Sequence, residues 1–151
     1  MSGVFFIVWD IASRSKSEVL RTTVGGYPHL TFMYTGNVYA EKELDDAVAY
    51  LWPRFVRQEL RLVDCSVNSF LKEKTGKMRH DVLLHVDSDF SQRIDRERNR
   101  FVKKGVVMLF PHVTHGCYET KEEAEEALQK VKSLLPIKVR ISGITINPRS
   151  K

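Results

Sequence analysis

The chain lacks the sequence features that mark membrane, secreted and disulfide-stabilised proteins. It contains no run of about 18 apolar residues, so we expect no membrane-spanning helix. Residues 1–10 have neither the basic start nor the small-residue cleavage site of a signal peptide. Only two cysteines occur, Cys65 and Cys117, and they form no CxxC pattern, so neither a disulfide scaffold nor a zinc site is indicated. We therefore expect a cytoplasmic, intracellular protein.

The sequence also lacks any low-complexity linker that would divide it. Its 151 residues have the length of one ordinary domain, and we expect a single domain over residues 1–151 that acts as a monomer. The hydrophobic content of 42% and charged content of 28% are ordinary for a globular protein. The net charge of +5 suits a polyanionic partner such as RNA or a nucleotide, but it is too modest to establish one.

Hydrophobic periodicity and turn residues predict six strands and three helices. The strands are expected at residues 4–9, 29–35, 61–71, 80–86, 106–114 and 137–146, and the helices at 41–55, 87–101 and 120–135. Pro53 is expected to kink or end the first helix, and residues 10–28 to be largely loop. This order contains hairpins as well as crossovers, which favours an α+β fold over a parallel doubly wound sheet.

One pentapeptide pattern occurs twice. Tyr27-Pro28-His29-Leu30-Thr31 and Phe110-Pro111-His112-Val113-Thr114 both read aromatic, Pro, His, aliphatic, Thr. The two histidines are 112 − 29 = 83 residues apart, slightly over half the chain, as a duplicated half-domain would give. Two His-x-Thr matches among the five histidines would arise by chance in roughly 2–3% of such sequences.

The residue types of this repeat suit phosphodiester chemistry. Residues i and i+2 of a strand face the same way, so His29 and Thr31 share one face, as do His112 and Thr114. One histidine can take a proton from the attacking oxygen while the other protonates the leaving oxygen, near neutral pH and without a metal. The two threonine hydroxyls can hold the phosphate between the imidazoles.

These paired motifs resemble those of the 2H phosphoesterase superfamily, the LigT-like or 2′-5′ RNA ligase-like proteins. The resemblance implies a bilobal, pseudo-symmetric α+β fold, with two antiparallel sheets and flanking helices around a central cleft. It also implies that His29 and His112 are catalytic and that Thr31 and Thr114 bind phosphate. The fourth motif position, usually apolar, is His115 here, which strand alternation points away from the cleft, like Phe32.

Several further residues are open to both a functional and a structural interpretation. Tyr34 and Tyr118 follow the two motifs and could stack on a base or simply pack. The basic residues at the hairpin turn could contact phosphates, although a solvated turn is the simpler interpretation; they are Lys72, Lys74, Lys77 and Arg79.

Other charged and histidine residues are expected to have structural or surface roles. These are His80 and His85, on opposite strand faces, and the arginines of the 87–101 helix, which carries both charge signs (Arg93, Arg96, Arg98 and Arg100). A zinc site at His112 and His115 is disfavoured because no usual ligand set completes it. Gly25-Gly26 lacks the pattern of a phosphate-binding loop and is expected to be a turn.

The sequence thus predicts a metal-independent phosphodiesterase without cofactors. Family resemblance favours RNA-type or nucleotide substrates with 2′,3′-cyclic phosphates or 2′-5′ linkages. Two alternatives remain: a hydrolase of cyclic di- or oligonucleotide signals, and a non-catalytic RNA-binding module. The pattern does not assign the acid and base roles to the two histidines.

Overall fold

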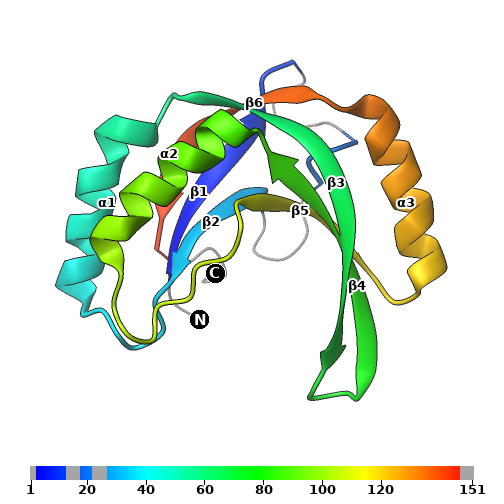
Figure 1. The fold of residues 1–151 in the computed structure, drawn as a ribbon, viewed down its shortest axis with the longest axis horizontal. Coiled ribbons are helices and arrows are strands. Elements are labelled where there is room, and N and C mark those ends of the chain that lie inside the picture. Colours follow the sequence, from blue (N-terminus) through cyan, green and yellow to red (C-terminus); the bar gives the residue numbers. More distant parts are fainter. Residues whose placement is uncertain (1–2, 13–17, 22–26, 147–151) are drawn as a thin grey trace.

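A computed structural model describes residues 3–12, 18–21 and 27–146. Over this part of the chain six strands, three α-helices and one 3-10 turn follow one another in the order expected from the sequence. They are β1 (Gly3–Asp10), β2 (His29–Tyr34), α1 (Glu41–Phe55), β3 (Glu59–Lys72), β4 (Lys77–Val86), α2 (Ser88–Arg98), the 3-10 turn (Asn99–Phe101), β5 (His112–Tyr118), α3 (Lys121–Leu134) and β6 (Ile137–Thr145) (Figure 1). The α+β class predicted from this order is confirmed. The expected Gly25-Gly26 turn lies outside the described residues.

The strands form one closed antiparallel sheet in the order β1-β2-β5-β4-β3-β6. Two separate sheets were expected, but β6 pairs with both β1 and β3 and so joins the strands into a single sheet. The link between β2 and β5 is short, since only Leu30 and Val113 are paired there. The hairpin of β3 and β4 is the longest, with pairs from Leu62↔Val86 to Lys72↔Lys77, and it extends beyond the other strands (Figure 1).

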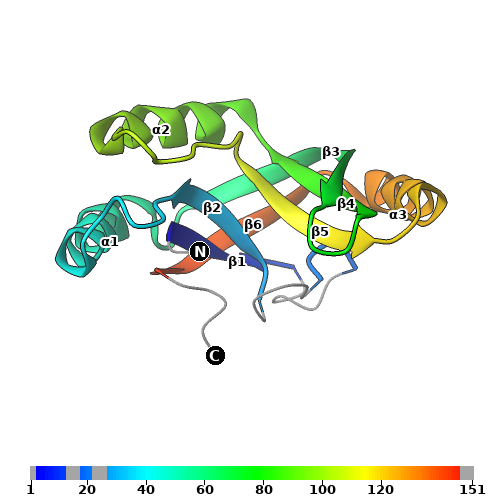
Figure 2. The ribbon, with the colours of Figure 1, turned by 90° about the horizontal axis from the view of Figure 1, so that it is seen from below.

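The helices cover the sheet from two sides. Helices α1 and α2 lie together on one side of the strands and α3 lies on the other (Figures 1 and 2). One face of each helix supplies apolar residues to a shared core with alternate residues of the strands. Fully buried members include Phe6, Phe32, Phe55 and Leu84. The opposite strand face remains available for polar side chains, and both His-x-Thr motifs use it.

Local sequence signals explain where the helices begin and end. The Asp87 carboxylate accepts a hydrogen bond from the Phe90 amide at 3.0 Å, and the Thr120 hydroxyl accepts one from the Glu123 amide at 3.2 Å, so each caps a helix N-terminus. Pro53 lies within the last turn of α1, which ends two residues later at Phe55. The expectation that Pro53 ends this helix is therefore correct to within a turn.

One predicted strand is displaced. The strand expected at residues 106–114 begins at His112 and continues to Tyr118. Residues 102–111 instead cross beside β2, held by the mutual backbone hydrogen bonds of Tyr34 and Val107. Pro111 has no amide hydrogen to donate to a ladder, which explains why regular pairing starts only after it.

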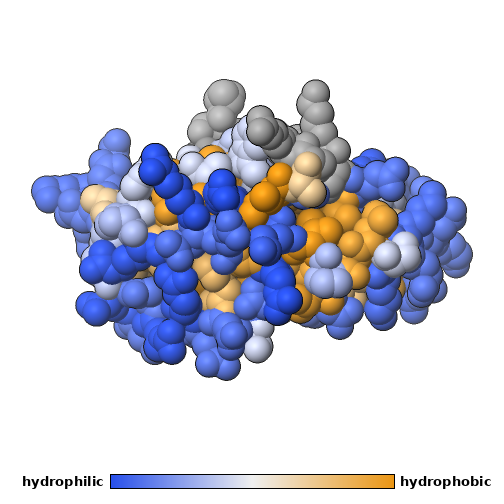
Figure 3. All heavy atoms as spheres, turned by 90° about the horizontal axis from the view of Figure 1, so that it is seen from above, coloured by the Kyte–Doolittle hydropathy of each residue, from blue (hydrophilic) through white to orange (hydrophobic). Residues whose placement is uncertain are grey.

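Polar and charged side chains cover most of the surface seen from above, with an apolar area on the side where α3 lies (Figure 3). Among the described residues, no helix combines the length and apolarity needed to cross a membrane.

Candidate active site

Both motif histidines line one cleft of about 250 Å³. His29 enters it from β2, and His112 and Thr114 enter it from β5. The other walls come from β3, β4 and the segment before β5, with Asn68, Phe70, Arg79, Asp81, Leu83, Leu109 and Phe110. Tyr34 and Cys117 complete the lining. The prediction that the two motifs meet in one cleft is thus matched by the position of three of their four polar residues.

The Leu30–Val113 pair explains how the motifs meet. Because β2 and β5 are antiparallel, this pair places His29 across from Thr114 and Thr31 across from His112. Strand spacing then puts the Cα atoms of the two histidines about 8 Å apart on the diagonal. A phosphate group fits between two imidazoles at that separation.

The two imidazoles are anchored in the same way. His29 Nδ1 donates to the carbonyl of Tyr27 at 3.3 Å, and His112 Nδ1 donates to the carbonyl of Phe110 at 2.8 Å. A carbonyl oxygen only accepts, so Nδ1 carries the proton in each neutral ring and Nε2 is the acceptor nitrogen. Each motif therefore presents the nitrogen that a general base needs.

Neighbouring aromatic rings fix the orientation of both imidazoles. His29 meets Phe5 edge to face, with ring centroids 5.5 Å apart. The ring of Phe110 packs against His112 at 4.9 Å and against His85 at 5.2 Å. These contacts restrict imidazole rotation and remove water from one side of each ring.

Burial lowers the pKa of His112 below its ordinary value of 6.5 because it disfavours the imidazolium, although the hydrogen bond to the Phe110 carbonyl acts in the opposite direction. His85, paired with His112 across β4 and β5, lowers the pKa of His112 further. Neutral His112 is thus the favoured form near pH 7.

The two motif threonines are not equally accessible. Thr114 is half-buried and lines the cleft, whereas Thr31 is buried and lies behind Tyr34. The hydroxyls of Thr31 and Tyr34 are hydrogen-bonded at 3.4 Å, and Tyr34 lines the cleft. The ring of Tyr34 makes a T-shaped contact with the ring of Phe5, with centroids 5.7 Å apart, while its hydroxyl meets Thr31.

β-Bulges follow both motifs and change which residues face the cleft. In β2 the register moves from Thr31 to Met33 against adjacent residues of β1, so Phe32 is the extra residue. In β5 it moves from Thr114 to Gly116 against adjacent residues of β4, so His115 is extra. The prediction that His115 points away from the cleft is confirmed: it is 3% exposed and donates from Nδ1 to the Val19 carbonyl at 2.7 Å.

The second bulge overturns the expected position of Tyr118. Simple alternation from Thr114 places Tyr118 on the cleft side, but the extra residue puts Cys117 there instead. Tyr118 lies with His115 in a different cavity beside α3. Burial, followed by a hydrogen bond to Asp81, raises the pKa of the Cys117 thiol to about 11, so this thiol stays protonated near pH 7 and is not a nucleophile.

The hairpin lysines lie outside the cleft. Lys74 and Lys77 are exposed at the tip of the β3–β4 hairpin and do not line it. Of the hairpin residues that do line it, Arg79 belongs to the basic run noted in the sequence, whereas Asn68, Phe70 and Asp81 were missed. Strand alternation across the hairpin would have found them, since they share one face of two paired strands.

His80 and His85 lie on opposite faces of β4, as expected. His80 Nδ1 is hydrogen-bonded to Ser69 Oγ at 2.6 Å, and His85 Nε2 to Ser66 Oγ at 2.6 Å. His85 belongs to the face that carries Arg79 and Asp81, directly beside His112. It is therefore the third histidine near the candidate site.

Arg98 contradicts the mixed-charge surface expected for α2. It is 5% exposed, and its guanidinium donates to the carbonyls of Thr31, Phe32 and Leu109 at 3.0, 2.7 and 2.6 Å. Charge pattern alone could not reveal this role, because the accepting carbonyls come from β2 and from the segment before β5. Arg98 therefore connects both motif regions to α2.

No group of three or more His, Cys, Asp or Glu side chains in the described part of the chain is arranged to hold a metal ion. Comparison with known proteins finds neither a family model nor a curated sequence that matches this chain.

Proposed function

We propose that the chain is a 2H-type phosphodiesterase that acts without a metal on RNA-type or nucleotide substrates carrying 2′,3′-cyclic phosphates or 2′-5′ linkages. The observation that carries this proposal is the matched anchoring of His29 and His112 in one cleft, each through Nδ1 to the carbonyl two residues earlier. The choice of substrate rests on the family resemblance of the two motifs.

The strand order supports a pseudo-symmetric fold of the kind the resemblance implies. Exchanging β1 with β4, β2 with β5 and β3 with β6 leaves the order of the closed sheet unchanged. The bulges follow the same exchange: Phe32 corresponds to His115, and Ser142 of β6 corresponds to Val63 of β3. A twofold axis through the Leu30–Val113 pair would then relate the two motifs.

The proposed reaction needs one proton acceptor and one proton donor. Neutral His112 takes the proton from water or a ribose hydroxyl as that oxygen attacks phosphorus, because burial favours its uncharged form. Protonated His29 then gives a proton to the ribose oxygen as its bond to phosphorus breaks. Thr114 and the Thr31–Tyr34 hydroxyl pair hydrogen-bond the non-bridging oxygens.

The test is turnover of a substrate panel in EDTA by the wild type, His29→Ala and His112→Ala. The panel contains a 2′,3′-cyclic nucleotide, a 2′-5′ dinucleotide, a 3′-5′ dinucleotide and several cyclic dinucleotides. We expect cleavage of the first or second, with a loss of roughly 10³-fold or more in each variant. His85→Ala is the matched control, because it removes a cleft-face histidine outside the motifs, and we expect it to keep activity within about tenfold.

Three other outcomes would contradict parts of the proposal. Cleavage of cyclic dinucleotides alone would identify a signalling hydrolase. Binding of RNA without turnover, unaffected by His29→Ala and His112→Ala, would identify a non-catalytic module. Activity that persists in both variants would remove the paired histidines from the mechanism. We also propose, as the sequence leads us to expect, that the protein is cytoplasmic and acts as a monomer.

A further inference from the structure

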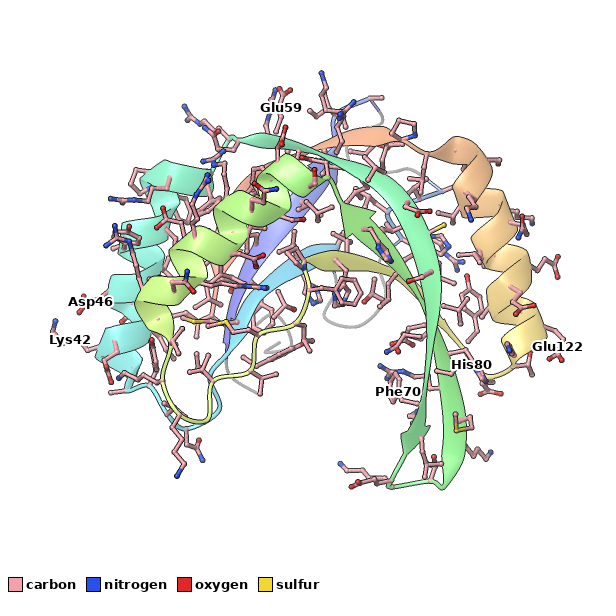
Figure 4. The ribbon with its side chains drawn as sticks, in the orientation of Figure 1. Lys42, Asp46, Glu59, Phe70, His80 and Glu122 are labelled. Atoms are coloured by element: carbon pink, nitrogen blue, oxygen red, sulfur yellow. The ribbon has the colours of Figure 1, made fainter. Side chains whose placement is uncertain are left out.

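The cleft extends from the histidines along the concave face of the β3–β4 hairpin. Phe70 and Arg79 are cross-strand partners on this face, and both line the cleft. Figure 4 shows Phe70 on the concave side of the hairpin and His80 on the other side. The described residues therefore place an aromatic ring and a guanidinium beside the candidate site.

The guanidinium of Arg79 lies over the ring of Phe70. Its guanidinium carbon lies 4.4 Å from the centroid of the Phe70 ring. Its Nε and a terminal nitrogen donate to the two carboxylate oxygens of Asp81, each at 3.0 Å. The Asp81 side chain is 8% exposed and that of Arg79 is 30% exposed. A bidentate pair of this kind fixes the plane of the guanidinium.

The same ion pair decides what the surface can bind. Because Asp81 neutralises Arg79, the pair offers a flat, nearly uncharged plane rather than a free cation for a phosphate. Arginine planes and aromatic rings stack on nucleobases. Asn68 is the cross-strand neighbour of Asp81 and also lines the cleft. Its exposed side-chain amide makes no hydrogen bond within the described part of the chain, so it can meet a base edge.

The position of the stack also fits a nucleotide. Asp81 lies two residues along β4 from Leu83, which pairs with Thr114. Strand spacing puts Asp81, whose carboxylate holds the guanidinium, about 7 Å along β4 from the level of Leu83 and Thr114. A ribose spans such a gap between its phosphate and its base.

We propose that Phe70 and Arg79 form a base-stacking platform for the nucleoside whose phosphate lies between His29 and His112. This inference rests on the proposed function for the location of the phosphate. It assigns the nucleobase of that substrate to the concave face of the hairpin, with little selection among bases because every base has a π-face. Asn68 supplies a hydrogen-bonding contact at the edge of the platform.

The experiment measures binding without turnover, by calorimetry. The ligands are adenosine 3′-monophosphate, ribose 5-phosphate and inorganic phosphate, each at two salt concentrations. The variants are Phe70→Leu, which removes the ring but keeps apolar bulk, and Phe70→Trp, which keeps a stacking surface. Leu71→Ala is the matched control, since Leu71 is the exposed neighbour on the opposite strand face.

We expect Phe70→Leu to weaken adenosine 3′-monophosphate binding about tenfold and to leave ribose 5-phosphate and phosphate binding unchanged. Phe70→Trp and Leu71→Ala should retain wild-type affinity. The ratio of nucleotide to ribose 5-phosphate affinity should be insensitive to salt, because stacking releases no counterions.

Equal affinity of Phe70→Leu and the wild type for the nucleotide would overturn the platform. If Phe70→Leu weakened the binding of all three ligands equally, the platform would also be overturned, and Arg79 would be a phosphate contact. Failure of the wild type to bind the nucleotide would overturn it as well. The two proposals fail separately. Nucleotide binding that depends on Phe70, without cleavage of any substrate, would support the platform and contradict the phosphodiesterase. Cleavage with kcat/KM unchanged in Phe70→Leu would support the phosphodiesterase and contradict the platform.

Discussion

At the scale of single residues, the candidate chemistry depends on the protonation state of His112. Burial lowers the pKa of this imidazole, so it stays neutral at a more acidic pH than an exposed histidine does. A general base must be neutral to accept a proton, so on the acidic side activity is lost as the pH falls through this lowered pKa. We predict that the acidic limb of kcat/KM lies below pH 6.5.

The measurement is a pH profile of kcat/KM from about pH 4.5 to 9 with the best substrate of the panel. The unfolding midpoint, recorded at each pH, separates loss of the base from loss of the fold. An acidic limb at or above pH 6.5 in a folded enzyme would show that His112 is not the base.

The residue scale is also where sequence reasoning was most and least effective. Strand alternation placed His112 and Thr114 on one face of β5, and both line the cleft because they precede the bulge of that strand. The meeting of His29 with these residues was implied by the family resemblance and not by alternation. Alternation failed for Tyr118, because the bulge at His115 shifts every later side chain of β5 to the other face. A bulge depends on the partner strand, so the β5 sequence alone does not reveal it.

At the scale of elements, α2 holds the motif region in place through one side chain. Replacing Arg98 by Met keeps the aliphatic stem but leaves the buried carbonyls of Thr31 and Phe32 without these donors. Each unsatisfied buried group costs about 1–3 kcal/mol. We predict that Arg98→Met lowers the free energy of unfolding by about 3 kcal/mol or more.

Urea denaturation of Arg98→Met and Arg96→Met tests this prediction. Arg96 lies on the same helix but is exposed, so its replacement should change the free energy of unfolding by no more than about 0.5 kcal/mol. A similar small change for Arg98→Met would mean that its three hydrogen bonds contribute nothing net to stability.

The elements themselves were predictable where their signals are local. Capping residues and apolar periodicity gave α2 and α3, and turn residues gave the β3–β4 hairpin. Residues 106–111 were wrongly predicted as part of a strand because their apolar pattern is typical of one. Their backbone instead meets β2 at Tyr34, a contact between distant parts of the chain that local pattern does not contain.

At the scale of the whole molecule, sequence order and sheet closure are separate questions. The predicted element order is compatible with two sheets or with one, because it does not state which strands are neighbours. Closure depends on β6 pairing with β1 on one edge and with β3 on the other, across most of the chain length. Such long-range pairings are set by tertiary packing rather than by local propensity.

Closure has a consequence for folding stability. Strand β6 follows α3 in the chain but hydrogen-bonds to β1 and β3, so neither half can unfold without exposing edges of the other. The apolar residues of both halves also share one core. We therefore predict a single two-state unfolding transition in urea, with the same midpoint by far-UV circular dichroism and by tryptophan fluorescence.

Tryptophan probes in each half of the chain test whether the two halves unfold together. Trp9 on β1 and Trp52 on α1 are half-exposed and report the first half of the chain. A variant with Trp9→Phe, Trp52→Phe and Leu134→Trp moves the probe to the partly exposed end of α3. Coincident midpoints, each compared with circular dichroism of the same variant, would show that the closed sheet couples the halves. A separate transition at α3 would mean that the second half unfolds independently, and the single Leu30–Val113 link between the motifs would then be the weakest point of the sheet.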